Sequence, residues 1–110
     1  MDRVRKIEKK YRKAFLEKFL SPEEIILSEK KDFYPFIAGR FAAKEAIQKA
    51  VSLKLLNPAE ITILNDENGK PFLDNLPDFL KKNSLPASAR ILISISHEKK
   101  YAAAMVIIEN

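Results

Sequence analysis

The spacing of apolar residues changes at Asn57-Pro58, and this change limits the chain to few folds. Before it, apolar residues recur every three or four positions, which is the period of an amphipathic helix. After it, apolar and polar residues alternate, as in strands with one buried face. The length of 110 residues suits one domain. We therefore expect a single α+β domain over residues 1–110, with N-terminal helices packed on an antiparallel sheet of hairpins.

Three helices are expected in the first half. Residues 3–20 carry a continuous apolar stripe. The sequence SPEE then predicts the start of a short helix, because Ser21 is a good N-cap, Pro22 fits the first helical position and Glu24 completes a capping box. Pro35 can open a longer helix that reaches about residue 53, since proline is tolerated in a first helical turn.

The second half predicts hairpins. Residues 61–64 and 71–73 read as extended segments around a turn at 66–69. Residues 74–86 mix proline, asparagine and lysine, and we expect a loop that can include one helical turn. Strands are expected over residues 91–96 and 101–108, joined by a short connection.

Composition excludes several classes of site. The chain has no cysteine, which rules out disulfides, thiolate zinc sites and a cysteine nucleophile. One histidine, His97, is too few for a His-rich metal site, and two glycines do not form a Gly-rich nucleotide loop. No apolar run approaches the ~20 residues of a membrane span. We expect a cytoplasmic protein without a membrane partner.

The excess positive charge lies in one segment. Residues 1–20 hold eight basic and three acidic residues, whereas the remainder of the chain is neutral. Such a patch attracts an anionic partner, namely nucleic acid, a lipid surface or an acidic protein, unless it is merely a solvated helix face. Nucleic acid is the weakest of these, because the aromatic residues of this segment fall on its apolar stripe.

The densest polar cluster lies within the expected long helix. Arg40 and Lys44 are four residues apart, and so are Glu45 and Lys49. Taken alone, this spacing favours solvent-side contacts worth ~0.3–0.5 kcal/mol. The other interpretation is a carboxylate that holds a hard cation, with lysine and arginine placed to meet phosphate oxygens.

Three separated motifs, taken in order, resemble the holo-acyl-carrier-protein synthases of the 4′-phosphopantetheinyl transferase superfamily. They are FIAGRFAAKEA at residues 36–46, NDENGKP at 65–71, and SISH at 94–97 followed by YAAA at 101–104. The resemblance implies the fold of that superfamily and transfer of 4′-phosphopantetheine from coenzyme A to a serine of acyl carrier protein, with release of adenosine 3′,5′-bisphosphate. It also implies Mg²⁺ and a homotrimer whose active site lies between neighbouring subunits.

The resemblance also implies roles for individual residues. Glu45 is the expected metal ligand, and Glu45 and Lys49 are the expected catalytic residues. A metal and a lysine at the leaving phosphate would stabilise the charge that develops there. The residues expected to contact coenzyme A are Arg40, Lys44, Gly69, Lys70, Pro71 and His97. The residues expected to contact the acidic carrier protein are Arg3, Arg5, Lys9 and Arg12.

The sequence departs from the family's pattern in two places. The family begins with a strand reading roughly Gly-x-Asp-Ile, whose Asp is a second metal ligand. We expect this chain to lack that strand, and Asp2 is out of register with the ligand. The family's Gly-rich loop after the catalytic lysine is replaced here by residues 51–57, which contain no glycine. Three hypotheses stay open: a working transferase, a degenerate paralogue that binds coenzyme A or carrier protein without efficient transfer, and a small basic nucleic-acid binder.

Overall fold

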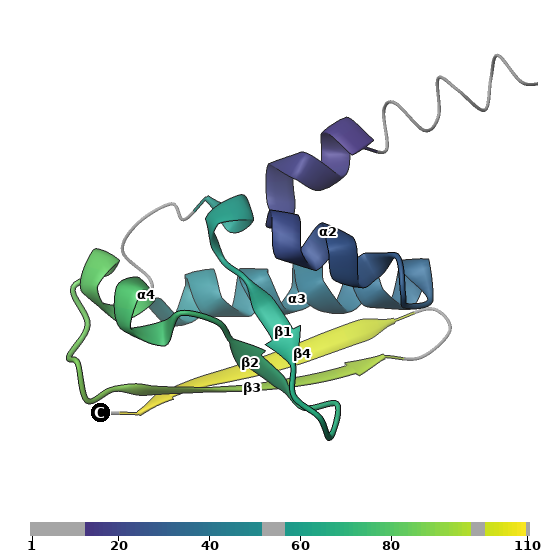
Figure 1. Cartoon of the computed structure of the whole chain (residues 1–110). Coiled ribbons are helices and arrows are strands. Elements are labelled where there is room, and N and C mark those ends of the chain that lie inside the picture. The colour runs from purple at the N-terminus through teal and green to yellow at the C-terminus, as the bar shows by residue number, and fades with distance from the viewer. Residues whose placement is uncertain (1–12, 52–56, 98–100, 110) are drawn as a thin grey trace, which may run out of the picture.

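The computed structural model describes residues 13–51, 57–97 and 101–109, with the side chain of His97 outside the description (Figure 1). Residues 13–19 are helical. Within the described ranges, no helix has both the length and the apolar character that crossing a bilayer requires. The further elements are α2 (Pro22–Ser28), α3 (Phe33–Val51), the 3₁₀ helix η1 (Pro58–Glu60), β1 (Ile63–Asn65), β2 (Pro71–Leu73), α4 (Leu76–Lys82), β3 (Arg90–His97) and β4 (Ala102–Glu109).

Two antiparallel hairpins form the β part of the fold. Strand β1 pairs with β2, and β3 pairs with β4 over eight residues, from Arg90 opposite Glu109 to His97 opposite Ala102. Helix α3 lies along the β3–β4 hairpin, and β2 lies beside β3 (Figure 1). The expected α+β fold of helices on antiparallel hairpins is confirmed.

The core has two parts. The larger lies where α3 meets both hairpins and α4, and it contains Ala43, Ile47, Ile61, Ile63, Leu73, Phe79, Leu80, Ala89 and Ile93. The smaller lies between the 13–19 helix, α2 and α3, and it contains Leu16, Phe19, Leu20 and Phe36. The alternation expected in the second half is present, because every second residue of β4 from Ala102 to Ile108 is half-buried and those between are exposed.

Helix α2 begins as its sequence predicts. The Ser21 hydroxyl accepts a hydrogen bond from the Glu24 backbone N–H at 3.3 Å, and the Glu24 carboxylate accepts one from the Ser21 N–H at 2.9 Å. Pro22 occupies the first helical position. The capping box is therefore confirmed.

Helix α3 begins two residues before the expected position. The carbonyl of Asp32 accepts the first helical hydrogen bond, from the Phe36 N–H at 3.1 Å. Pro35 is thus the third residue of the helix, still within the first turn, where backbone N–H groups have no partner inside the helix. A proline at this place costs no hydrogen bond.

Two expectations for the second half were wrong. Residues 76–82, expected within a loop with one helical turn, form the longer helix α4, which buries Phe79 and Leu80. The first strand begins at Ile63 rather than residue 61, because the Ile61 N–H bonds the Pro58 carbonyl at 3.1 Å and closes the η1 turn.

Candidate functional site

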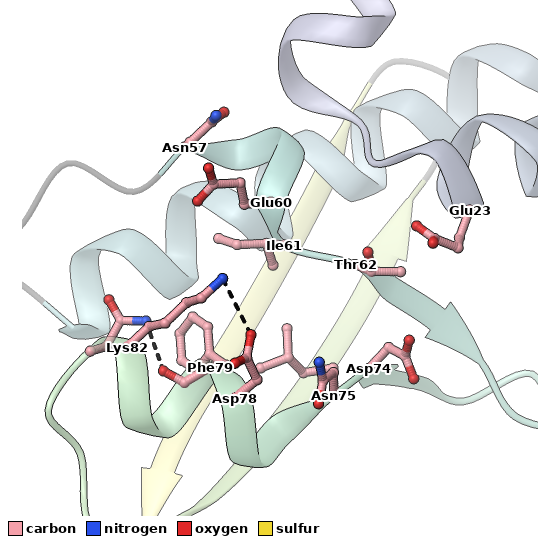
Figure 2. Close-up of a pocket in the computed structure, with 12 residues that line it drawn as sticks. Glu23, Asn57, Glu60, Ile61, Thr62, Asp74, Asn75, Asp78, Phe79 and Lys82 are labelled. Atoms are coloured by element: carbon pink, nitrogen blue, oxygen red, sulfur yellow. Dashed lines mark hydrogen bonds and ion pairs between the residues drawn. The ribbon is translucent and has the colours of Figure 1, made fainter.

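Two cavities of similar size lie on the described part of the chain. One is lined mainly by acidic side chains, and the other has more basic than acidic residues in its lining. The larger, about 350 Å³, is bordered by the 57–62 segment, β2 and α4 and is lined by the carboxylates of Glu23, Glu60, Asp74 and Asp78 (Figure 2). Its single cation, Lys82, is paired with Asp78 at 3.3 Å. This acidic cavity would repel a phosphate ligand.

The second cavity, about 310 Å³, lies between α3 and the β1–β2 hairpin. It is lined by residues of two of the sequence motifs, among them Gly39 and Arg40 of α3 and Gly69 and Pro71 of the hairpin. Lys31 at the start of α3 adds a second cation, and Asp32 a carboxylate. We call this the α3–hairpin pocket. The structure therefore brings together Arg40, Gly69 and Pro71, which were expected to act together.

Arg40 forms one wall of the α3–hairpin pocket and is held firmly there. Its Nε donates to the Ile63 carbonyl at 3.0 Å, and an Nη2–H bonds the side-chain oxygen of Asn65. The guanidinium carbon lies 4.5 Å from the centre of the Phe36 ring, a cation–π distance. Burial lowers the pKa of Arg40, and the nearby charge of Glu24 opposes that effect.

Lys44 does not face this pocket. Only 4% of it is exposed, and its ammonium donates to the Phe19 carbonyl at 2.7 Å, the Pro58 carbonyl at 2.7 Å and Glu24 Oε1 at 2.5 Å. A lysine has three N–H donors, so all three are in use. The expectation that Lys44 contacts a phosphate is not supported; the structure gives it an internal ion pair instead. Burial lowers the pKa of Lys44, and Glu24 raises it in smaller measure.

Glu24 is the residue of this region that sequence reasoning missed. Its side chain is fully buried, and besides Ser21 and Lys44 it accepts a hydrogen bond from the Ile63 N–H at 3.0 Å through Oε2. Glu24 and Arg40 together bond both backbone groups of Ile63, on the edge of β1 that does not pair with β2. The capping box predicted the position of Glu24 but carried no signal of this second role.

The expected catalytic pair lies apart from the pocket residues. Glu45 and Lys49 are exposed on α3, and among the described residues no ion pair joins them. Glu45 borders a small apolar recess of about 50 Å³ that also includes Phe19, Phe41 and Gln48. The structure does not bring Glu45 and Lys49 together with Gly69 and Pro71 in one cavity of a single chain.

The remaining expected site residues are only partly described. Lys70 is exposed in the turn between β1 and β2, where its backbone N–H bonds Asp66 at 2.8 Å. His97 ends β3 opposite Ala102, and its side chain lies outside the described part. The expected carrier-protein contacts Arg3, Arg5, Lys9 and Arg12 also lie outside the described residues, as does most of the segment that replaces the Gly-rich loop.

Comparison with known proteins gives a consistent result over nearly the whole chain. The family model described as the 4′-phosphopantetheinyl transferase superfamily matches residues 1–106. The chain is 38% identical to the holo-[acyl-carrier-protein] synthase of Chlorobium chlorochromatii, over 99% of this chain and 92% of that protein. It is 43% identical to the synthase of the same name from Chlorobium limicola, over 98% and 86%.

Solved structures agree. The Helicobacter pylori holo-[acyl-carrier-protein] synthase in complex with coenzyme A matches with a TM-score of 0.76 and 32% identity, over 98% of this chain and 92% of that one. The Neisseria meningitidis synthase matches with a TM-score of 0.77 and 30% identity, over 99% and 90%.

Proposed function

The chain belongs to the 4′-phosphopantetheinyl transferase superfamily, and from this premise we propose that it is a holo-acyl-carrier-protein synthase. It transfers the 4′-phosphopantetheine arm of coenzyme A to a serine of apo-acyl carrier protein and releases adenosine 3′,5′-bisphosphate. Identity of 38–43% over 86–92% of the length of synthases of this name, and a matched structure that holds coenzyme A, support the activity.

The observation that carries the proposal is the α3–hairpin pocket. Coenzyme A has a nucleotide end with several phosphates, and such a ligand needs a concave site with positive charge. This pocket has the guanidinium of Arg40 in its wall and Lys31 at its rim, whereas the larger cavity is acidic. We assign the nucleotide end of coenzyme A to this pocket, with Gly69, Lys70 and Pro71 near the adenosine and His97 near the 3′-phosphate.

Charge balance supports the same assignment. The buried cluster next to the pocket contains two cations, Arg40 and Lys44, and one carboxylate, Glu24. The cluster therefore carries a net positive charge in a region from which water is largely excluded, where charges act more strongly than in bulk water. An anionic ligand in the pocket would offset it. Lys44 contributes to this field even though it makes no contact with the ligand.

Glu45 and Lys49 supply the chemistry. An exposed lysine on α3 can donate to the phosphate oxygen that gains charge as the pyrophosphate bond breaks. We assign Glu45 to orient a water that takes the proton of the attacking serine hydroxyl.

The donor set fits magnesium. Among the described residues no three acidic or histidine side chains cluster into a cage, but Mg²⁺ commonly uses one or two carboxylates, waters and substrate phosphates. The exposed carboxylate of Glu45 meets that need. When bound, Mg²⁺ would neutralise the charge that develops on the phosphates.

We further propose that the enzyme is a homotrimer with a shared active site. Glu45 and Lys49 do not line the α3–hairpin pocket of the same chain, and this separation fits a site that a second copy completes. The acidic carrier protein would be attracted by the basic segment 1–20 through Arg3, Arg5, Lys9 and Arg12. We place the enzyme in the cytoplasm.

The test is one incubation of the protein with coenzyme A, Mg²⁺ and apo-acyl carrier protein, read by intact mass. We expect the carrier to gain one phosphopantetheine group, and a carrier whose acceptor serine is replaced by alanine to gain nothing. Glu45→Gln should abolish the Mg²⁺-dependent transfer, because it keeps the shape of the side chain and removes its charge. Lys49→Ala should lower kcat more than coenzyme A affinity.

Three outcomes would overturn parts of this proposal. Binding of coenzyme A without transfer would make the chain the degenerate paralogue. Absence of both binding and transfer would reject the function. Near-normal turnover of both variants would show that the catalytic residues are wrongly assigned.

A further inference from the structure

We propose that Asn65 is a positioning residue of the coenzyme A site. It joins Arg40 of α3 to the 66–70 turn and thereby holds Gly69 and Pro71 against the α3–hairpin pocket. The inference rests on the proposed function, and it assigns Asn65 a role in the affinity for coenzyme A rather than in the chemical step.

The 66–70 turn sets its own shape. One carboxylate oxygen of Asp66 accepts hydrogen bonds from the Asn68 N–H at 2.9 Å and the Lys70 N–H at 2.8 Å. The Asp66 carbonyl accepts another from the Gly69 N–H at 2.9 Å. Gly69 has a φ of 83°, which a glycine adopts at little cost. These bonds lie inside the turn, so they do not fix where the turn sits relative to α3.

Asn65 links the turn itself directly to α3, beyond the bond that holds β1 at Ile63. Its side-chain oxygen accepts a hydrogen bond from Arg40 Nη2–H, and its side-chain nitrogen donates to the Gly69 carbonyl at 2.9 Å. A guanidinium can only donate and a carbonyl can only accept, so the bridging group must do both. A side-chain amide does both, whereas an ionised carboxylate has no donor and an aliphatic side chain has neither.

The inner end of the bridge is rigid. Arg40 is 4% exposed and bonds the Ile63 carbonyl, and Glu24 bonds the Ile63 N–H. The outer end is exposed at Gly69. Asn65 therefore fixes the exposed turn relative to the buried cluster. Asn65 also lines the pocket, together with Gly69 and Pro71.

The consequence differs from that of losing a catalytic residue. Glu45 and Lys49 lie elsewhere on α3, so removal of the bridge leaves them in place. Strand β1 stays bonded to Arg40 through the Ile63 carbonyl, and the turn keeps its internal hydrogen bonds but loses the Asn65 bridge that ties it directly to α3. Coenzyme A must then order the turn as it binds, which lowers affinity and leaves the rate of the bound complex nearly unchanged.

The experiment compares two asparagines of one hairpin in the full-length protein. Asn65→Ala removes both bonds of the bridge. Asn65→Asp keeps an acceptor for Arg40 and removes the donor to Gly69. Asn68→Ala and Asn68→Asp are the matched controls, because Asn68 is exposed in the same turn and its bond to Asp66 uses the backbone N–H. Asn65→Asp and Asn68→Asp both add a negative charge to the hairpin, but only Asn65→Asp also removes the hydrogen bond to Gly69. Their comparison therefore separates the effect of the charge from that of the lost bond.

The readouts are the Kd of coenzyme A by calorimetry, kcat and KM in the transfer assay, and Tm. Both Asn65 variants should raise the Kd and KM for coenzyme A about tenfold and leave kcat and the KM for carrier protein within about twofold. Both Asn68 variants should stay within about twofold of wild type in Kd, kcat and both KM values. If the Asn65 variants bind coenzyme A as wild type does, if the Asn68 variants lose as much affinity, or if kcat falls at unchanged Kd, the inference is overturned. A wild-type protein that neither binds nor transfers would instead reject the proposed function itself.

Discussion

Lys44 and Lys49 lie on the same helix in opposite environments, and this contrast yields a prediction about stability. Lys44→Met leaves the buried Glu24 carboxylate without its 2.5 Å partner, and removing one member of a buried ion pair costs about 3–5 kcal/mol. Lys49→Met is the control, because Lys49 is exposed and methionine and lysine have similar helix propensities. It should change the free energy of unfolding by less than about 0.5 kcal/mol. Urea denaturation of both variants measures this, and equal values would contradict the structural role of Lys44.

The activities of the same two variants should rank in the reverse order. Lys49→Met should lose transfer while it keeps wild-type stability, since Lys49 is assigned to the leaving phosphate. Lys44→Met, assayed well below its Tm, should retain much more activity. The pair thus separates a lysine that holds the fold from a lysine that acts on substrate.

The titration of Lys44 gives a second prediction at this scale. Burial lowers its pKa below the ordinary 10.5, Glu24 partly opposes the shift, and Arg40 adds to it. The folded protein therefore holds this proton less tightly than the unfolded chain does. Stability rises with pH wherever the unfolded state binds more protons. The contribution of Lys44 should thus increase as pH rises from its lowered folded pKa toward 10.5.

The measurement is the difference in unfolding free energy between wild type and Lys44→Met across alkaline pH. We expect this difference to grow in favour of wild type. A difference that shrinks would mean that attraction by Glu24 outweighs burial and raises the pKa of Lys44.

Among the elements, α2 begins with a capping box formed by residues close in sequence, and single substitutions can test its contribution to stability. Ser21→Ala removes the hydroxyl that accepts the Glu24 N–H bond, and loss of such a cap costs ~1 kcal/mol. Ser28→Ala is the matched control in the same helix: its hydroxyl donates to the Ile25 carbonyl at 2.6 Å, and alanine has the higher helix propensity. Ser28→Ala should be neutral or slightly stabilising in thermal denaturation. An equal loss in both variants would show that burial of the serine, not capping, matters.

The elements that were predicted correctly depend on neighbours in sequence. The capping box of α2 and the alternation of β3 and β4 are visible within a few residues. The length of helix α4 was underestimated because the helix has only seven residues, contains Pro77 and is flanked by Asn75 and Asn83. Tertiary burial of Phe79 and Leu80 stabilises it, and a short helix has little stability without such packing.

The candidate site likewise contains some residues that the sequence predicts and others that it does not. The motifs that resemble the family predicted Arg40, Gly69 and Pro71 as site residues, and the structure places all three around one pocket. Glu24 and Asn65 were not predicted as site residues, because their roles depend on partners distant in sequence. Glu24 bonds Ile63 across 39 residues, and Asn65 bonds Arg40 across 25. No local pattern reports such contacts.

For the whole molecule, the β3–β4 hairpin has one apolar face that the described part of the chain leaves exposed. Helix α3 covers the face of the hairpin on which Ile93 lies. On the other face, Leu92, Met105 and Ile107 are 41%, 63% and 45% exposed. Leu92 lies directly opposite Ile107 in the register, and Met105 is two residues away on the same face. A contiguous apolar patch on a two-stranded sheet is typical of an interface.

The expected occupant of this face is two further copies of the chain, which follows from the proposed homotrimer. Light scattering of wild type at micromolar concentration should give three times the 12.6 kDa of one chain. Met105→Lys should shift the protein to monomer, because a charge buried without a partner costs several kcal/mol. Ile26→Lys is the control, since Ile26 is a similarly exposed apolar residue, 61% exposed on α2. If the trimer completes the active site, Met105→Lys loses transfer in parallel with dissociation and Ile26→Lys keeps both. A monomeric wild type with full transfer activity would contradict both the trimer and the shared site.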